Sequence, residues 1–403
     1  KKIGQYFSHL DHLITLHQRK HFDLLKAGKN AWEQRKFGEL YSKVSEKNDL
    51  SFGTDKIISV ANMYFKEEVK DSSDEYMRTY NVMRLGDIAF EGNKSKNYAH
   101  GRFVENTIGD GIVSHVFDVF RPIEKYDLQF WKYLINNEGV MGRIMMRCTK
   151  ASTMMTNLVA SDFLKEEISV PSIEEQKKIG QYFSHLDHLI TLHQRKCEET
   201  KKMKKFMLKK MFPQNGSRVS EIRFDGFTDD WEQRKLGDEL EFLKDGTHGT
   251  HQDAEQGPYL LSAKNIKNGQ VIIDDTSERK ISREEFNQIH SKFKMKAGDV
   301  LLTIVGSIGE TAILENTEDY TFQRSVAFLR PGKNLTSKFL KTEIESVQFQ
   351  KELNDRKSQS AQPGVYLNDL AKIPLSVTYI DEQVKIGQYF EHLDNLITLH
   401  QQK

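Results

Sequence analysis

A stretch of twenty residues that occurs three times constrains the fold of this chain more than any other feature. It reads KKIGQYFSHLDHLITLHQRK at Lys177–Lys196, is repeated without change at Lys1–Lys20, and returns as KIGQYFEHLDNLITLHQQK at Lys385–Lys403. Its apolar residues recur at steps of three and four, which places them on one face of an α-helix. These residues are Ile179, Phe183, Leu186, Leu189 and Ile190 in the middle copy and Ile386, Phe390, Leu393, Leu396 and Ile397 in the last copy.

A single apolar helix face ordinarily packs within its own domain. Because the same surface is made again later in the chain, we expect the middle and last copies to pair as an antiparallel coiled coil. Ser172 and Glu175 have the spacing of a capping box, and no Gly or Pro lies between Gln181 and Phe212. The middle helix is therefore predicted to run from Ile173 to Phe212.

The rest of the chain is also duplicated, because short matches follow one another in the same order in both halves. WEQRKFG at Trp32–Gly38 matches WEQRKLG at Trp231–Gly237. Three further matches follow at similar offsets: Gly86-Asp87 with Gly298-Asp299, Arg121-Pro122 with Arg330-Pro331, and Phe130–Ile135 with Phe339–Ile344. Small drifts in offset are expected when two copies of one domain differ by loop insertions. Two related domains with different middles are predicted.

Each half begins with short β-rich segments and continues with helices, which predicts an α+β domain. Val300–Val305 and Val113–Phe120 are examples of such segments. The predicted divisions are a helix copy and linker at 1–31, a first domain at 32–172, a central helix at 173–213, a linker at 214–230, a second domain at 231–378 and a final helix at 379–403.

Composition is that of a globular protein, with 403 residues, 37% hydrophobic residues and 29% charged residues. The formal net charge is only +1, so any nucleic-acid binding must depend on local patches. Cys148 and Cys197 are the only two cysteines and match no metal-ligand spacing, which favours a reducing cytoplasm. No apolar run of membrane-spanning length and no signal peptide are evident, although a chain that begins at Lys1 leaves the true start open.

Signatures of catalysis are missing from the sequence. Gly306-Ser307-Ile308-Gly309 has neither the spacing nor the lysine of a phosphate-binding loop, and no catalytic residue is predicted. His248 and His251 could bind a metal, but no second His or Cys pair lies nearby in the sequence. A polar loop that offers hydroxyl and imidazole groups to a partner is the favoured interpretation, and no metal site is predicted.

Candidate contacts to nucleic acid come from loops that mix basic, amide, hydroxyl and aromatic side chains. Such side chains donate to phosphates and read base edges, although ordinary surface loops have a similar composition. The candidates in the first domain are Lys94, Lys96, Asn97, Tyr98, Arg102, Arg147, Lys150 and Ser152; those in the second are Thr247, His248, Arg324, Arg356, Lys357, Ser358 and Gln359. The basic run from Arg195 to Lys210 could face a phosphate backbone or an acidic partner, but a solvated helix face is its ordinary role.

The whole pattern resembles the specificity subunit of type I restriction-modification enzymes. The resemblance rests on the repeated I-G-Q-Y-F-x-H-L-D helix, the W-E-Q-R-K start of each domain, and Ala297–Leu301 followed by Leu329–Pro331, and it covers nearly all of Trp32–Lys403. It implies two target-recognition domains in pseudo-twofold relation, held apart by an antiparallel coiled coil, each reading one half of a split DNA site.

The same resemblance implies a non-catalytic chain that docks two methyltransferase subunits on its helices, with motor-nuclease subunits further out. S-adenosylmethionine, ATP and magnesium are then expected in those partners and not in this chain. The copy at Lys1–Lys20 departs from the family pattern, because it precedes the first domain. A structural adaptor that assembles proteins without reading DNA is the alternative function.

Overall fold

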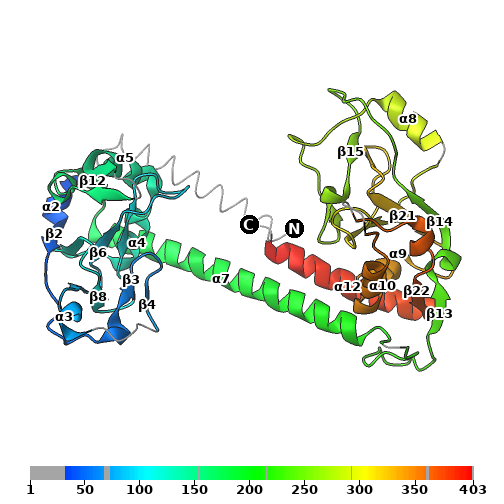
Figure 1. Ribbon diagram of the computed structural model, residues 1–403, viewed down its shortest axis with the longest axis horizontal. Helices are drawn as coiled ribbons and strands as arrows, with labels where there is room; N and C mark the ends of the chain where they lie inside the picture. The colour runs from blue at the N-terminus through cyan, green and yellow to red at the C-terminus, as the bar shows by residue number, and fades with distance from the viewer. Residues whose placement is uncertain are drawn as a thin grey trace. The chain divides into compact units, whose positions relative to one another are not determined.

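The computed structural model describes residues 32–67, 73–151, 155–214, 216–291, 293–359 and 363–401. The chain divides into two compact units after Leu189, and each unit combines small, mostly antiparallel sheets with short helices (Figure 1). The predicted α+β class with two similar domains is therefore confirmed. The helix copy at Lys1–Lys20 and its linker lie outside the described residues.

The first unit contains a four-stranded antiparallel sheet in the order β2-β9-β6-β7. Its elements in chain order are β1 (Glu33–Lys36), α2 (Phe37–Leu40), β2 (Tyr41–Val44), η1 (Thr54–Lys56), β3 (Ile58–Ser59), β4 (Tyr64–Phe65), α3 (Asp74–Met77), β5 (Asn81–Met83), β6 (Ile88–Glu91), β7 (Arg102–Glu105), β8 (Gly111–Val113), β9 (Val119–Pro122), α4 (Leu128–Ile135), α5 (Glu138–Cys148), β10 (Thr149–Ala151), β11 (Thr156–Leu158), α6 (Ala160–Phe163) and β12 (Glu167–Val170). Aromatic and aliphatic side chains of the sheet pack against α4, α5 and α6 to form its main core.

The second unit repeats this plan with the sheet order β14-β21-β18-β19. Its elements are β13 (Glu232–Lys235), η2 (Leu236–Glu239), β14 (Leu240–Asp245), β15 (Tyr259–Leu261), η3 (Ala263–Asn265), β16 (Ile266–Lys267), β17 (Gln270–Val271), α8 (Arg283–Ser291), β18 (Val300–Thr303), β19 (Thr311–Ile313), β20 (Tyr320–Phe322), β21 (Val326–Pro331), α9 (Ser337–Ile344), α10 (Val347–Asp355), α11 (Leu367–Leu370) and β22 (Pro374–Val377). In both units the W-E-Q-R-K strand pairs with the last strand, β1 with β12 and β13 with β22.

The repeated Gly-Asp and Arg-Pro motifs meet in each unit as a buried ion pair. The guanidinium of Arg121 contacts Asp87 at 2.9 Å, and that of Arg330 contacts Asp299 at 2.7 Å. Each aspartate also accepts a backbone hydrogen bond from the residue three positions earlier, which closes the turn before β6 or β18. The glycine in each turn has a φ of +85° or +93°, a conformation that favours glycine. These motifs therefore fix the same tight turn to the two central strands of the sheet in both units.

Two long helices carry the repeated stretch, α7 (Ile173–Lys210) and α12 (Ile380–Gln401). The α7 helix begins in the first unit, ends in the second, and stops two residues before the predicted Phe212. A glutamine in the first turn of each helix accepts a backbone hydrogen bond at the start of a core helix, Gln176 from Asp127 and Gln383 from Thr336. The repeated segment is therefore anchored to its own domain in the same way in both units.

The glycine of the I-G-Q-Y-F motif is explained by this anchoring. A Cβ atom on Gly180 would lie 2.7 Å from the backbone nitrogen of Phe130 in α4. A Cβ atom on Gly387 would lie 2.7 Å from the Cβ atom of Lys338 in α9. Each long helix thus crosses the first turn of its domain's core helix at a distance that excludes a larger side chain.

The apolar stripe of the repeat packs differently from our expectation. In the first unit Ile179 packs on the domain core, and the Phe183 ring lies 5.1 Å from that of Tyr133 in α4 but stays 42% exposed. In the second unit Ile386, Phe390 and Leu393 are buried in the core that contains α9. Each copy therefore packs on its own domain, because its glycine and glutamine hold it against that domain's core helix.

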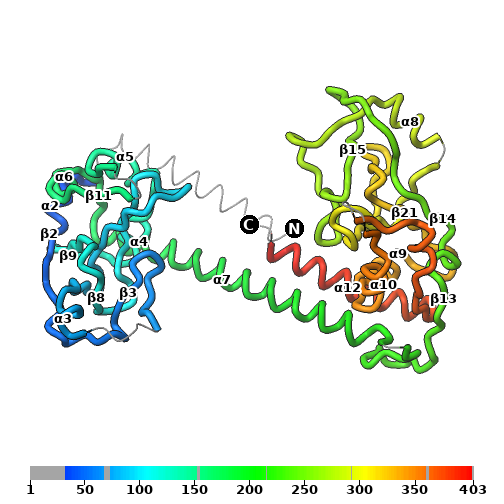
Figure 2. Tube along the Cα trace, in the orientation of Figure 1, coloured from blue at the N-terminus to red at the C-terminus, as the bar shows by residue number. Residues whose placement is uncertain are grey.

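Antiparallel pairing of α7 with α12 does occur, and it uses the end of α7 (Figure 2). Leu208, Met211 and Phe212 share the core with the α12 stripe, and the Cys197 thiol lies 3.9 Å from the carbonyl of Ile397. The two copies meet at their last histidines, where Nδ1 of His193 lies 3.0 Å from Nδ1 of His400. The predicted partner of the α12 stripe is thus corrected from Ile179–Ile190 to the segment that begins at Cys197. Leu186, Leu189 and Leu396 are half-buried, and Ile190 is 48% exposed.

Four largely buried charges reinforce this helix pair. The ammonium of Lys204 in α7 contacts Glu345 at 2.5 Å and Asp394 of α12 at 2.6 Å. The ammonium of Lys341 in α9 contacts the same two carboxylates at 2.8 and 2.7 Å. These pairs hold the pKa of Lys341 above its usual value, even though burial alone would lower it. The two ammonium groups and the two carboxylates alternate at the corners of a square, the charge square. Each charge therefore has two opposite charges beside it, which offsets its desolvation and fixes the register of α7, α9 and α12.

Candidate nucleic-acid interface

In the first unit two loops meet at one end of the central sheet. The loop between β6 and β7 bridges to the β10–β11 hairpin through Asn93 and Met155. The hydroxyl oxygen of Thr156 lies 3.0 Å from the carbonyl oxygens of both Gly92 and His100, between which it can share its one hydrogen. This contact places the two predicted contact loops side by side, although 45 residues or more separate them in the sequence.

The predicted contact residues of the first unit divide into free and neutralised cations. Lys94, Lys96 and Asn97 are exposed in the β6–β7 loop, and Lys150 is exposed on β10. Within the described residues, none of these three lysines forms an ion pair. They are therefore available to phosphate oxygens or base edges.

The two arginines of this set are already occupied. Arg102 contacts Glu91 at 2.9 Å and donates to the carbonyl of Ala61, and its guanidinium lies over the Tyr98 ring at 5.0 Å. Arg147 forms several hydrogen bonds to the Glu166 carboxylate. Both arginines thus organise the loops, and Tyr98 is half-buried beneath one of them. Ser152 lies outside the described residues.

In the second unit four chain segments converge at the equivalent end of the sheet. Thr247 bridges to Gln323, and its carbonyl accepts a hydrogen bond from the backbone of Arg324 at 3.0 Å. The next residue, Ser325, accepts backbone hydrogen bonds at the end of β18. Val305, after β18, bridges to Gly364, whose carbonyl accepts from the backbone of Ser358.

Most of the predicted contact residues of the second unit lie where these four segments converge. Arg324, Lys357 and Gln359 are exposed, and no carboxylate pairs with these two cations among the residues that the structure covers. Arg356 instead contacts Glu352 at 2.5 Å, and the imidazole of His248 contacts Asp245 at 2.6 Å. Thr247 and Ser358 are half-buried and hold the segments together through their backbones.

The histidines of the Gly246–His251 loop have carboxylate partners on separate elements. His251 contacts Glu285 of α8 at 2.7 Å, while His248 contacts the end of β14. No group of three or more metal-ligating side chains is found in the described ranges. These imidazoles therefore serve as hydrogen-bonding groups that anchor the loop.

The structure adds two residues to this interface that we did not predict. Gln323 bridges to Thr247, and Lys264 lies on η3, whose first backbone nitrogen donates to the Ser325 hydroxyl at 3.0 Å. Lys264 is 60% exposed while contacting Glu278 at 3.0 Å. The pairing of β15 with β20 brings these residues to this end of the sheet, and no pattern in the sequence indicates that pairing.

Both units therefore present loops at the same scaffold position. The β6–β7 loop corresponds to the β18–β19 loop, and the segment after α5 corresponds to the segment after α10. The side chains in these loops differ between the units, whereas the ion-paired turns that precede β6 and β18 are the same in both. Two copies of one scaffold thus carry two different polar surfaces.

No helix in the described ranges has the length and apolar character to cross a membrane.

Comparison with known proteins gives one family. The family model described as "Type I restriction modification DNA specificity domain" matches residues 30–202 and 228–403. The chain is 25% identical over 248 residues to the type I restriction enzyme MjaVIII specificity subunit of Methanocaldococcus jannaschii, and 28% identical over 169 residues to the EcoBI specificity subunit of Escherichia coli. The first match covers 58% of this chain and 56% of the relative, and the second covers 41% of this chain and 35% of the relative. The chain thus spans about half the length of the first curated relative and about a third of the second.

Two solved structures share the fold. A type I restriction-modification system S subunit from M. genitalium gives a TM-score of 0.55 at 14% identity, covering 93% of this chain and 92% of that one. A chain from a study of complex assembly and conformational transition of the type I R-M system gives 0.51 at 15% identity, covering 92% of each.

Proposed function

The chain belongs to the family of type I restriction-modification DNA specificity domains, and on that premise we propose that it recognises a DNA sequence within a methylation and restriction complex. Each domain reads one half of a bipartite site through the loops at the end of its central sheet. The chain itself is non-catalytic.

One observation supports this proposal most strongly. Exposed cations that have no carboxylate partner among the described residues gather at the equivalent end of the central sheet in both units, at Lys94, Lys96 and Lys150 in the first and at Arg324 and Lys357 in the second. The neighbouring arginines are neutralised by Glu91, Glu166 and Glu352 and shape the loops. Unpaired cations beside amide and hydroxyl groups suit a surface that binds phosphates and reads base edges.

The helices supply the second part of the proposal, the docking of two methyltransferase subunits. Large apolar side chains are exposed along α7, including Tyr182 (41%), Ile190 (48%), Met203 (50%) and Phe206 (50%). Such residues on a helix otherwise rich in charge favour a protein partner. S-adenosylmethionine, ATP and magnesium are held by partner subunits in this proposal, with motor-nuclease subunits joining the assembly and the complex acting in the cytoplasm.

The test is a gel-shift measurement with the reconstituted methyltransferase, comparing a duplex selected for binding with random duplexes. Lys150→Ala and Lys357→Ala should each weaken binding of the selected duplex by about 1–3 kcal/mol if the lysine touches a base, or lower the salt slope by about one if it touches a phosphate. Lys165→Ala and Lys372→Ala are matched controls, since these exposed lysines lie beside Asp162 and Asp369 away from the loops.

Equal affinity for selected and random duplexes would favour the structural adaptor over the sequence reader. Unchanged binding in both loop variants would remove Lys150 and Lys357 from the interface. Cleavage of DNA by the purified chain with magnesium would contradict the non-catalytic assignment.

A further inference from the structure

The turn between β3 and β4, residues 60–63, is tied to the β6–β7 loop of the candidate interface. The guanidinium of Arg102 pairs with Glu91 at one end of that loop and lies over the ring of Tyr98 within it. The same guanidinium donates a hydrogen bond to the carbonyl of Ala61 in the turn at 2.5 Å. One arginine therefore holds the turn and the loop side by side, although no residue of the turn was predicted as a contact.

The backbone of this turn is fixed at both of its ends. Val60 is 2% exposed, and Met63 packs on the same apolar cluster. The carbonyl of Ser59 accepts hydrogen bonds from the backbone nitrogens of Asn62 and Met63, at 3.3 and 2.8 Å. Between these anchors Asn62 is exposed, and its side chain forms no hydrogen bond with the residues that the structure describes. The turn thus presents one unpaired carboxamide on a rigid backbone.

The conformation of the turn does not account for an asparagine at position 62. Asparagine is common in turns because it tolerates a positive φ and because its side chain can bond to the nearby backbone. Here the positive φ, +49°, belongs to Met63, and within the described chain the Asn62 side chain makes no such bond. A turn that needed asparagine for its shape would carry it one position later.

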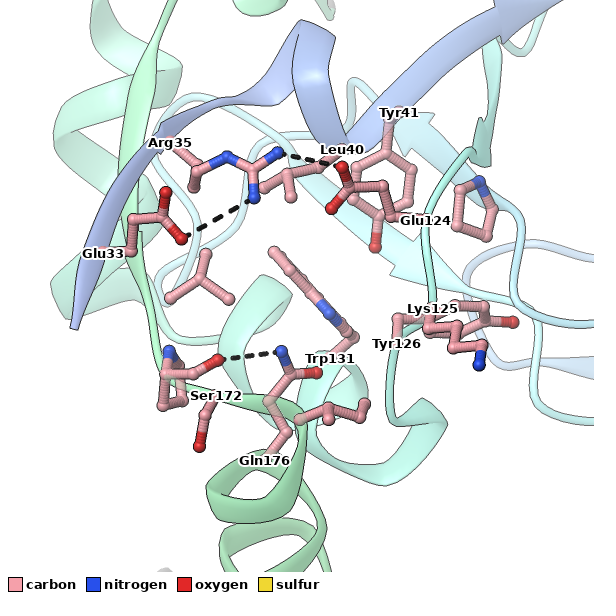
Figure 3. A pocket seen from close by; sticks show the side chains of 14 residues that line it. Glu33, Arg35, Leu40, Tyr41, Glu124, Lys125, Tyr126, Trp131, Ser172 and Gln176 are labelled. Carbon is pink, nitrogen blue, oxygen red and sulfur yellow. Dashed lines mark hydrogen bonds and ion pairs between the residues drawn. The ribbon is translucent and has the colours of Figure 1, made fainter. Parts of the chain in front are cut away.

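The cavity beside the first turn of α7 differs in this respect (Figure 3). Its volume is about 410 Å³, and charged and polar side chains line much of it. The Arg35 guanidinium lies 3.1 Å from the Glu124 carboxylate. The Gln176 amide donates to the carbonyl of Pro171 at 3.1 Å. Because these groups have partners within the protein, they do not require a ligand, whereas the Asn62 carboxamide keeps its donors and its acceptor available.

The second unit adds a segment to its interface from the same part of the domain. In the stretch between the first strand of the sheet and the Gly-Asp turn, the backbone nitrogen of Ala263 donates to the Ser325 hydroxyl at 3.0 Å. The carbonyl of Ala263 accepts from the Ser307 hydroxyl at 3.4 Å. These bonds bring Lys264 to the second interface, as Arg102 brings Asn62 to the first. The corresponding segments therefore present different side chains, a lysine in one unit and an asparagine in the other.

A rigidly held carboxamide can recognise adenine in the major groove of DNA. Its NH2 group donates to N7 of the base and its oxygen accepts from the N6 amino group, so the two bonds together select adenine. Lys94 and Lys96 in the adjoining loop are exposed and suit the flanking phosphates. We propose that Asn62 reads an adenine in the half-site of the first domain, and that Arg102 is the positioning residue that holds its turn. This inference rests on the function proposed above.

The test is a binding measurement on the full chain reconstituted with its methyltransferase subunits. The parent complex first selects a duplex from a random library, and all single-base variants of that duplex are then compared between the parent and Asn62→Ala. We expect Asn62→Ala to weaken binding of the selected duplex about five- to hundredfold and to relax the preference at one A·T pair. Asn62→Asp lacks the donor for N7 and should reject adenine at least as strongly.

A change in the DNA tests the same contact from the other side. Replacing the adenine of that pair by 7-deazaadenine removes the N7 acceptor, so it should weaken binding of the parent several-fold and leave binding of Asn62→Ala unchanged. Asn334→Ala is the matched control, because Asn334 is an exposed asparagine that follows β21 at the end of that strand opposite the interface. This variant should keep the affinity and the base preferences of the parent.

The outcomes separate this inference from the function on which it rests. Selection of no sequence by the parent complex would contradict the proposed function and the inference with it. If the parent does select a sequence, unchanged preferences in Asn62→Ala would overturn the inference and leave the function standing. Equal weakening for all duplexes, as from a lost phosphate contact, would overturn base reading. Relaxation at a G·C pair would overturn the assignment to adenine.

Discussion

Replacing Glu105 by glutamine should stabilise the first unit, and by an amount that depends on pH. Glu105 is 2% exposed and neither of its oxygens has a hydrogen-bond partner among the described residues, so its pKa rises from an ordinary 4.5 to about 9. Between pH 4.5 and about pH 9, Glu105 keeps its proton in the folded chain but loses it in the unfolded chain. Stability therefore falls as pH rises through this window, and below pH 4.5 the penalty vanishes.

The magnitude follows from about 1.4 kcal/mol for each pH unit above the unfolded pKa. At pH 7 the interval is 2.5 units, so the glutamate costs the fold about 3 kcal/mol. Glutamine keeps the shape and the unpaired polar atoms but cannot ionise. Glu105→Gln should thus match the parent chain near pH 4.5 and exceed its free energy of unfolding by about 3 kcal/mol at pH 7.

Hydrogen exchange of β7 and β6 measured in urea at several pH values reports the stability of the first unit alone. The Glu343→Gln variant, read from α9, gives a parallel measurement in the second unit. A gain from Glu105→Gln that is equal at pH 4.5 and pH 7, or a loss of stability at pH 7, would refute the assignment of Glu105 as a protonated buried acid.

Two further substitutions test the helix packing. Asp394→Asn removes one carboxylate of the charge square and leaves the ammonium groups of Lys204 and Lys341 to share Glu345, so the second unit should lose about 3 kcal/mol of stability in urea unfolding. Lys338→Met, which breaks an exposed pair, should change the stability by less than about 1 kcal/mol. Similar losses from both variants would contradict the role of burial. Gly387→Ala places a Cβ atom 2.7 Å from the Cβ atom of Lys338 in α9, and should lower the free energy of unfolding by about 1–3 kcal/mol in the same assay. An unchanged free energy of unfolding would contradict the tight crossing of α12 and α9.

Repetition in the sequence predicted much of the fold. The Gly-Asp and Arg-Pro motifs marked two equivalent domains, and the structure gives them a shared role as the ion pairs Asp87–Arg121 and Asp299–Arg330. The capping signal before Ile173 also located the start of α7. These features are local or repeated, so they leave a trace that can be read without coordinates.

The packing of the repeated helix could not be predicted in the same way. An apolar stripe specifies that a surface is buried but not which surface buries it. Gly180 and Gly387 carried the missing information, because each permits the helix to cross a core helix of its own domain. A glycine within a helical pattern has several explanations, and only the position of the Phe130 backbone selects this one.

Loop composition predicted the location of the candidate interface better than the role of each residue. Lys94, Lys150 and Lys357 are exposed and form no ion pair with the residues that the structure describes, as a contact residue should, whereas Arg102 and Arg147 are held by Glu91 and Glu166. Sequence gives no sign of that division, because both carboxylates lie outside the loops that they neutralise. Glu105 was missed for a similar reason, since an acidic residue on a short strand ordinarily faces solvent.

The central claim is that each domain reads its own half of a DNA site. Its most direct test is to exchange residues 32–172 for the equivalent segment of another family member and to map the methylated sequence in a host that carries the partner subunits. We predict that one half of the recognised sequence changes while the other half is retained. A change in both halves, or in neither, would contradict the account.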